Sequence, residues 1–317
     1  MAAVPQQRPI GDAIRRRRAG ALIDTPIEWS IRATALLTIV ILAGILTLLL
    51  WQGLQLFVDR GYSVSRFLSF PNAITDNTTD PTKFRFGIVP PLVATLWVTL
   101  ITLVVAVPLG MATAVFISEV APPRIRLVIK SIAELLAGVP TVVFAFVGLA
   151  LVAPKVREVF GWGVGGLSGF TAGIVVAFVA VPLIISIADD ALQAVPRDLR
   201  ESAYALGSNK LEVTFFVVMP AAISGLTAAV MLGMARAIGE TMVVLILAGG
   251  NSSLPATATE SMRPMTATIA SGFGNATTQS LIRPALFMTG AVLFLLTFVT
   301  TLLADLVLER QRRKFGR

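Results

Sequence analysis

The chain has 317 residues, of which 55% are hydrophobic and only 14% charged, and it contains neither cysteine nor histidine. An average soluble domain is about 25% charged, so this composition predicts a polytopic membrane protein. It excludes disulfides, thiol chemistry and the usual zinc sites, and we expect neither a metal nor a cofactor. The formal net charge of +8 fits basic residues at membrane surfaces better than nucleic acid binding.

Six transmembrane helices account for the apolar stretches, because about 20 apolar residues cross a bilayer as a helix. The first uncharged run, 33–58, is too long for the apolar part of a signal peptide. We expect an all-α transmembrane domain over 31–310, between basic tails at 1–30 and 311–317. The predicted spans are 33–57, 88–118, 135–154, 167–188, 222–249 and 284–306.

Basic residues set the direction of these spans. With six spans, the side that holds both termini carries 17 Lys and Arg residues and the other side 8. Lys and Arg accumulate on the cytoplasmic side, so we predict cytoplasmic N and C termini. A seventh span would place the basic tail 310-RQRRKFGR-317 outside, against this rule.

The predicted inner loop, 189–221, is long and amphipathic for a linker between spans. Pro196 stands where a helix can begin, Gly207 where it stops, and Pro220 ends a second apolar piece. We therefore expect a short helix, a glycine turn and a second helix, which together suit docking of another protein. An ordinary linker is the alternative.

The spacing in this loop resembles the EAA loop of ABC-importer permeases. In that family the loop forms coupling helices that dock on a cytoplasmic ATPase dimer, and this chain has no phosphate-binding P-loop of its own. The matching positions are Glu201, Ala203, Gly207 and Pro220, with conservative departures at Ser202, Val217 and Met219.

Further segments resemble the phosphate-specific branch of these importers, and its PstC type more than its PstA type. They are 134-ELLAGVPTVVFAFVGL-149, 234-MARAIGETMVVLILAGG-250 and 265-MTATIA-270, and the resemblance covers about 85–310. It implies a bacterial inner membrane location and no enzymatic activity in this chain. It also implies three partners: a second homologous permease, an ATP-binding dimer and an extracytoplasmic phosphate-binding protein. A sulfate or molybdate permease is the alternative.

Small residues recur every fourth position in the fifth predicted span. They form one stripe that allows close helix packing, either within the chain or against a second permease. A substrate surface is the less favoured interpretation. The stripe consists of Gly225, Ala229, Gly233 and Ala237 and continues to Thr241.

Arg236 and Glu240 lie beside this stripe, four residues apart in an apolar stretch. An arginine at the bilayer centre costs about 2.5–3.5 kcal/mol, so ionisable residues there indicate function. Arginine donors match a tetrahedral oxyanion, which predicts an anion path with added donors from Thr241, Thr266 and Thr268. An ion pair that locks helices and a secondary anion transporter are the alternatives. A membrane enzyme is disfavoured because the sequence has no histidine, no cysteine and no cluster of carboxylates that could serve as an active site.

The other charged residues near the predicted membrane ends are given ordinary roles. We expect solvated or capping carboxylates at Glu119, Glu134, Asp189, Asp190 and Asp305. We expect contacts with anionic lipid headgroups from Arg124, Arg126 and Lys130.

Overall fold

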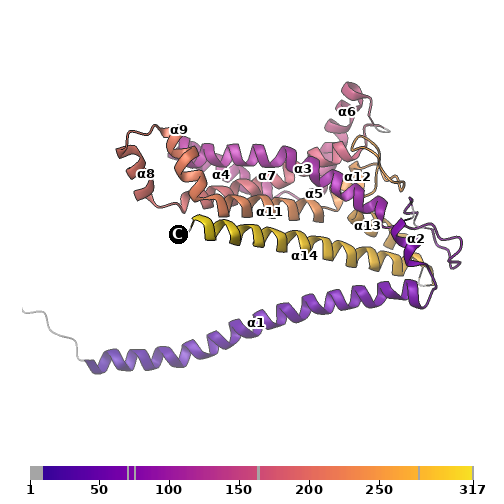
Figure 1. The fold of residues 1–317 in the computed structure, drawn as a ribbon, viewed down its shortest axis with the longest axis horizontal. Coiled ribbons are helices and arrows are strands. Elements are labelled where there is room, and N and C mark those ends of the chain that lie inside the picture. The colour runs from indigo at the N-terminus through magenta and orange to yellow at the C-terminus, as the bar shows by residue number, and fades with distance from the viewer. Residues whose placement is uncertain (1–9, 70, 75, 163–164, 278, 316–317) are drawn as a thin grey trace, which may run out of the picture. The chain divides into compact units, whose positions relative to one another are not determined.

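The computed structural model describes residues 10–69, 71–74, 76–162, 165–277 and 279–315 (Figure 1). The chain divides into two units, 1–51 and 52–317, and each is described by itself. Helices dominate both units, and the described residues contain isolated β-bridges but no strand. The predicted all-α class is therefore confirmed.

The first unit consists of most of helix α1 (Ile10–Val58). The helix begins within the predicted basic tail, whose residues 1–9 lie outside the described part of the chain. From Glu28 to Val58 it is long and apolar enough to cross a membrane. Thr34, Thr38 and Thr47 each donate a hydrogen bond to the carbonyl one turn earlier, which satisfies the hydroxyls within the helix.

The second unit is built from helices and three π-helical segments (η). Their bounds are α2 Val64–Ser69, α3 Val89–Val115, η1 Phe116–Val120, α4 Pro123–Gly138, α5 Thr141–Val147, η2 Gly148–Val152, α6 Ala153–Phe160, α7 Gly169–Gln193, α8 Arg197–Ala205, α9 Lys210–Glu212, η3 Val213–Val218, α10 Met219–Ala221, α11 Ile223–Gly239, α12 Met242–Leu247, α13 Met265–Asn275 and α14 Ile282–Phe315.

Four stretches could cross a membrane as single helices, and two bent pairs bring the number to six among the described residues. Three of the four lie in the second unit: 89–120, 169–193 and 282–303. The bent pairs are α4 with α5–α6, at 94°, and α9–α10 with α11, at 72°. A polytopic membrane fold is confirmed, while the side of the membrane on which each terminus lies stays a prediction.

The structure divides two stretches that the sequence treats as single helices. The predicted span 135–154 crosses the bend between α4 and α5, where Val139 and Pro140 are both extended. Proline disfavours a helical conformation in the residue before it, so Val139 is extended and α4 ends at Gly138. The predicted span 222–249 is interrupted at Glu240 and Thr241.

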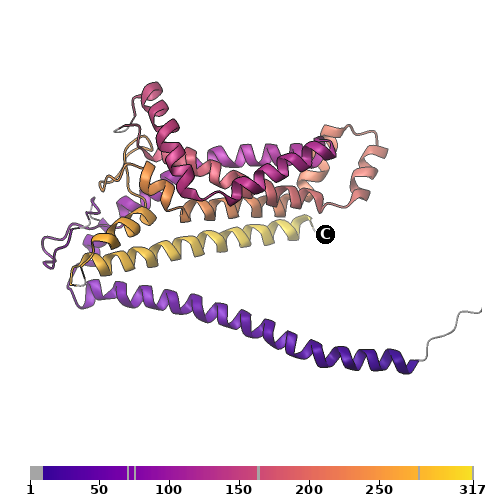
Figure 2. The ribbon, with the colours of Figure 1, turned by 180° about the vertical axis from the view of Figure 1, so that it is seen from behind.

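Helices α3, α7 and α11 pack side by side and form the centre of the second unit (Figures 1 and 2). Small residues on α7 and α11 let the backbones of neighbouring helices lie close to one another. A Cβ on Gly173 would lie 2.7 Å from Ile101, and the Thr102 hydroxyl donates to the Gly173 carbonyl at 3.1 Å. On α11, a Cβ on Gly233 would lie 2.8 Å from Ile184 of α7.

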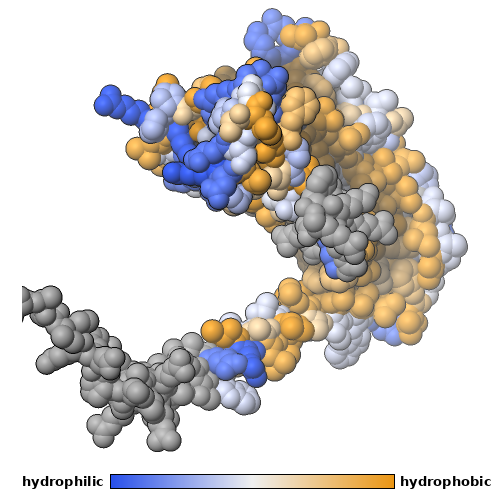
Figure 3. Space-filling view, turned by 60° about the vertical axis from the view of Figure 1, so that its left-hand side comes forward, coloured by the Kyte–Doolittle hydropathy of each residue, from blue (hydrophilic) through white to orange (hydrophobic). Residues whose placement is uncertain are grey.

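The two ends of this unit differ in character. Helices α8 and α9 lie at one end, together with the C-terminal end of α14, whereas α2, α6 and α13 lie at the other (Figure 1). In Figure 3 hydrophilic residues gather toward the α8 end, and the sides of the helices are largely hydrophobic. On α3 the apolar side chains of Leu100, Val104 and Leu109 are exposed, as expected for lipid contact.

The contact between α11 and α7 is closer at Gly225 than at Gly233. A Cβ on Gly225 would overlap the Ala191 Cβ. Gly225→Ala should therefore lower the thermal stability of the detergent-solubilised protein, since overpacking typically costs about 1–3 kcal/mol. Gly44→Ala is the control, because no atom lies within 4 Å of the added Cβ and alanine favours the helix. Equal melting temperatures for Gly225→Ala and the unchanged protein would contradict the close packing.

Candidate functional site

The interruption between α11 and α12 centres on Glu240. Helix α11 ends at Gly239, and Glu240 takes an extended conformation with φ −68° and ψ 128°. Its carboxylate is only 3% exposed and accepts a hydrogen bond of 3.4 Å from the Val243 amide in the first turn of α12. A carboxylate is favourable at that place, because the amide groups of a helix N-terminus are unpaired and carry partial positive charge.

A threonine on another helix completes this junction. Where α11 stops, the Glu240 carbonyl leaves regular helical bonding, and the Thr266 hydroxyl donates to it at 2.7 Å. Thr266 lies in α13, whose first amide, that of Met265, donates in turn to the Thr95 hydroxyl of α3. The break is thus connected to both α13 and α3.

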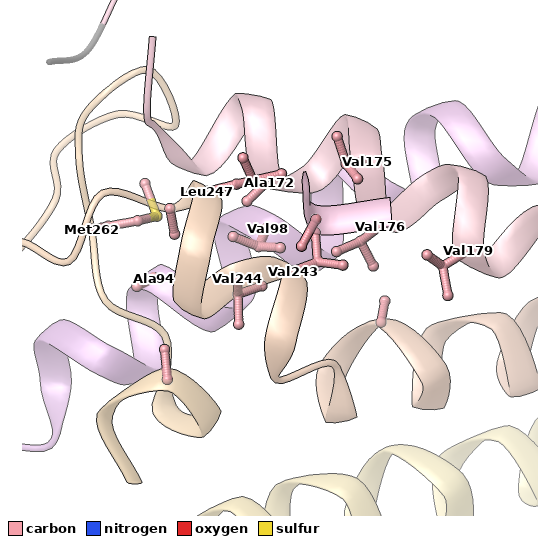
Figure 4. Close-up of a cluster of buried hydrophobic side chains, with 14 residues drawn as sticks. Ala94, Val98, Ala172, Val175, Val176, Val179, Val243, Val244, Leu247 and Met262 are labelled. Carbon is pink, nitrogen blue, oxygen red and sulfur yellow. The ribbon is translucent and has the colours of Figure 1, made fainter. Parts of the chain in front are cut away.

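A buried apolar cluster holds α12 beyond the break (Figure 4). Val243, Val244 and Leu247 of α12 pack with Val98 of α3 and Val176 of α7. All five side chains are less than 4% exposed. The position of Glu240 is therefore set by packing on both sides of it.

Arg236 differs from its partner in exposure. Its Nη2 lies 3.7 Å from the Glu240 Oε2, and the arginine side chain is 45% exposed. That separation is an ion pair rather than a hydrogen bond. Within the described part of the chain the Arg236 guanidinium makes no hydrogen bond, so its donors can bind an outside ligand.

The small-residue stripe of α11 lies beside Arg236 and packs against α7. Ala229, Gly233 and Ala237 are buried, and Gly225 contacts Ala191 of α7. Thr241 lies past the end of α11. Helix α11 therefore approaches α7 closely at Gly225 and Gly233, while an interface of this stripe with a second permease stays a prediction.

The three predicted threonine donors bond to the backbone. The Thr268 hydroxyl is fully buried and donates to the Pro264 carbonyl, as that of Thr266 does to Glu240. The Thr241 hydroxyl reaches only the Gly239 carbonyl, at 3.3 Å. Of the predicted path residues, Arg236 and Glu240 are brought together, and Thr266 joins them through the backbone.

Sequence reasoning missed a second arginine, Arg263, in the segment that leads into α13. Arg263 lies three residues before Thr266, is partly buried, and its guanidinium has no hydrogen bond or ion pair among the described residues. Burial lowers the pKa of Arg263 below its usual value, because the charge is incompletely solvated. A left-handed glycine turn, Gly249–Gly250, lies beside it. The only sequence signal was a lone arginine in a polar loop.

The inner loop has the predicted helix–turn–helix form. Helix α8 precedes Gly207, whose φ of +89° favours glycine. Asn209 and Glu212 then form a capping box, with hydrogen bonds of 3.0 and 2.8 Å. Glu201 is exposed and Ala203 is buried. Contact of this loop with an ATPase stays a prediction.

Several charges expected to meet solvent or lipid are paired within the protein. Asp189 is fully buried, which contradicts the expected solvated role. It accepts from Arg126 at 3.3 Å and from Lys130 at 3.1 Å, so these two cations serve the protein interior and not only headgroups. Glu119 pairs with Arg200 at 3.0 Å. The predicted role of the Asp305 side chain lies outside the described residues.

The comparison with protein families decides the class of this protein. A model described as "Binding-protein-dependent transport system inner membrane component" matches residues 106–313. The chain belongs to this family. It is a multi-pass inner membrane permease of the ABC transporter class, as the resemblance of its inner loop implied.

Curated relatives cover most of the permease. A probable ABC transporter permease protein of Bacillus subtilis, YqgH, is 33% identical over 282 residues, which is 89% of this chain and 90% of the relative. The phosphate transport system permease protein PstC of Mesorhizobium japonicum is 32% identical over 333 residues, 99% of this chain and 98% of the relative. The PstC protein of Xylella fastidiosa strain Temecula1 is 33% identical over 302 residues, 90% of each chain.

Solved structures show the same fold at low sequence identity. A bacterial alginate ABC transporter, in complex with an alginate-bound periplasmic protein, gives a TM-score of 0.59 at 15% identity. The match covers 92% of this permease and 98% of that chain. An inward-facing MetNI methionine transporter gives 0.50 at 15% identity, over 69% and 91% of the two chains.

The hydrogen bond between Thr266 and Glu240 can be tested directly. Thr266→Val keeps the shape of the side chain but leaves the Glu240 carbonyl without its donor, and an unpaired buried polar group costs about 1–3 kcal/mol. We expect a lower melting temperature in detergent. Thr113→Val is the control, because the Thr113 hydroxyl is exposed and bonds a carbonyl of its own helix. A Thr266→Val protein that melts like the control would show that the bond does not hold the junction.

Proposed function

We propose that this permease is the membrane-spanning, non-catalytic subunit of an ATP-driven phosphate importer. Relatives named as phosphate transport permeases, one of them aligned over 99% of this chain, support the substrate. The inner loop with its EAA spacing supports coupling to a separate ATP-binding dimer. A second homologous permease and an extracytoplasmic phosphate-binding protein complete the proposed complex, which lies in a lipid membrane and does not bind nucleic acid.

The observation that carries the proposal is the contrast between Arg236 and Glu240. The carboxylate is buried and held by the α12 amide, whereas the guanidinium is 45% exposed and has no hydrogen bond among the described residues. A guanidinium in this position offers a planar set of donors to an oxyanion. Arg236 therefore receives phosphate in this proposal.

Glu240 limits how tightly the anion is held. Its fixed negative charge, 3.7 Å from the guanidinium, competes with phosphate and favours release. A carboxylate also accepts a hydrogen bond from a protonated phosphate, which sulfate cannot offer at neutral pH. Arg263, three residues before Thr266 and next to Gly250, supplies a second positive charge in this proposal. The threonine hydroxyls, which bond backbone carbonyls, shape the proposed path rather than donate to the anion.

Arg236 is the first residue to test in a reconstituted complex of the permeases, ATPase and binding protein. Arg236→Gln should lower ATP-driven uptake of labelled phosphate about tenfold or more, because a hydrogen bond to a charged group is worth about 1.5–3 kcal/mol. Arg157→Gln, at an exposed arginine of α6, is the matched control and should keep full uptake. Uptake at the full rate by Arg236→Gln would refute this anion path.

The choice of phosphate over other oxyanions needs a separate measurement. Labelled phosphate uptake by the unchanged complex is measured with sulfate or molybdate in excess. We expect no competition, because neither anion carries the proton that Glu240 can accept. Strong competition by either anion would favour the alternative substrate. Uptake that continues without the ATPase would instead favour a secondary anion transporter.

A further inference from the structure

Helix α8, the first helix of the inner loop, has little apolar contact with the rest of the unit. Of its nine residues only Ala203 is buried. A cavity of about 580 Å³, lined by residues that include Pro196, Leu199 and Phe216, lies on one side of it. A second cavity, of about 430 Å³, lies on another side and is lined by charged and polar residues. Apolar packing alone therefore holds α8 weakly.

Arg200 supplies the missing connection. Its Nη1 donates to the Val195 carbonyl at 2.7 Å, and its Nη2 donates to the Leu192 carbonyl at 2.8 Å. Both carbonyls belong to the C-terminal end of α7 and the residues just after it, where a cation is favoured. The same Nη2 donates to the Glu119 carboxylate at 3.0 Å. We call these contacts the Arg200 clamp.

The Arg200 clamp joins α8 to the end of the preceding helix α7 and to η1, which lies 81 residues away in the sequence. Arg200 lies in α8, its two carbonyl partners lie at the end of α7, and Glu119 lies in η1, which continues α3. The side chains of Arg200 and Glu119 are only 18% and 9% exposed. Solvent screening is weak at such burial, so this pair constrains geometry more than a surface pair would.

A second ion cluster connects the neighbouring helix to the same end of α7. The buried Asp189 accepts from Arg126 and Lys130 of α4 and, at 2.6 Å, from Gln193 one turn further along α7. Lys130 also reaches Asp190 at 3.1 Å. The ends of α3, α4, α7 and α8 are therefore linked by charged contacts at one end of the unit.

We propose that the Arg200 clamp transmits the movement of α8 to α11, the helix that carries Arg236. Helices α3 and α7, which the clamp holds, both pack against α11. When α8 is displaced, the clamp moves α3 and α7 with it, and α11 follows through its close contacts at Gly225 and Gly233. Arg200 is thus a positioning residue, and this inference rests on the proposed ATP-driven function.

The test compares transport with ATP hydrolysis in the same reconstituted preparation. Arg200→Gln and Glu119→Gln should each lower the phosphate transported per ATP hydrolysed by roughly tenfold, a usual size for lost coupling between sites. ATP hydrolysis itself should persist, because the ATPase is a separate chain. A purely structural defect would lower transport and hydrolysis in proportion and leave their ratio unchanged.

Control variants separate the clamp from charge loss in general. Lys155→Gln removes an exposed ion pair with Glu158 in α6 and should leave the ratio unchanged. Arg200→Lys keeps the charge but loses the fork that reaches three acceptors, so we expect an intermediate ratio. Assembly of each variant is checked by co-purification of the ATPase.

The outcomes also separate this inference from the proposed function. An unchanged ratio in both Arg200→Gln and Glu119→Gln complexes that still hydrolyse ATP would overturn the clamp. If the unchanged complex hydrolyses ATP but takes up no phosphate, the proposed function fails instead.

Discussion

The buried carboxylate of Glu240 is the interaction on which the candidate site depends. It lies where α11 ends, accepts from the first turn of α12 and pairs with Arg236 at 3.7 Å. A buried charge is costly unless it is paired and hydrogen-bonded, so both contacts stabilise the buried carboxylate. Glu240 therefore connects the helix break, which Thr266 and the apolar cluster around α12 also hold, to the position of the exposed guanidinium.

Charge is used differently at the two ends of the second unit. Arg236 is ion-paired with Glu240 but, like Arg263, has no side-chain hydrogen bond among the described residues, and our proposal assigns these free donors to the anion. At the α8 end, Arg200, Arg126 and Lys130 are matched to buried carboxylates. Cations that are hydrogen-bonded to carboxylates fix the positions of helices, whereas guanidinium donors without a hydrogen bond stay open to a ligand. The close packing of α3, α7 and α11 connects the two ends.

Much of the architecture followed from periodicity and composition. The apolar stretches, the small-residue stripe, the glycine turn at Gly207 and the family resemblance could all be identified in the sequence, since each depends on local spacing. The two bends were harder to identify from the sequence. Pro140 gave a signal for the first, but Glu240 and Thr241 break a helix without proline, because contacts from α13 and the α12 core stabilise the break.

The sequence by itself therefore determined the class of protein, its long apolar stretches and the pairing of Arg236 with Glu240, since those signals lie within about one helical turn or one apolar run. Only the tertiary structure decided which charges are matched. Asp189 pairs with Lys130, which is 59 residues away in the sequence, and Arg200 pairs with Glu119, which is 81 residues away. Such pairs depend on how the helices pack, and no local sequence pattern predicts which distant residues will come together.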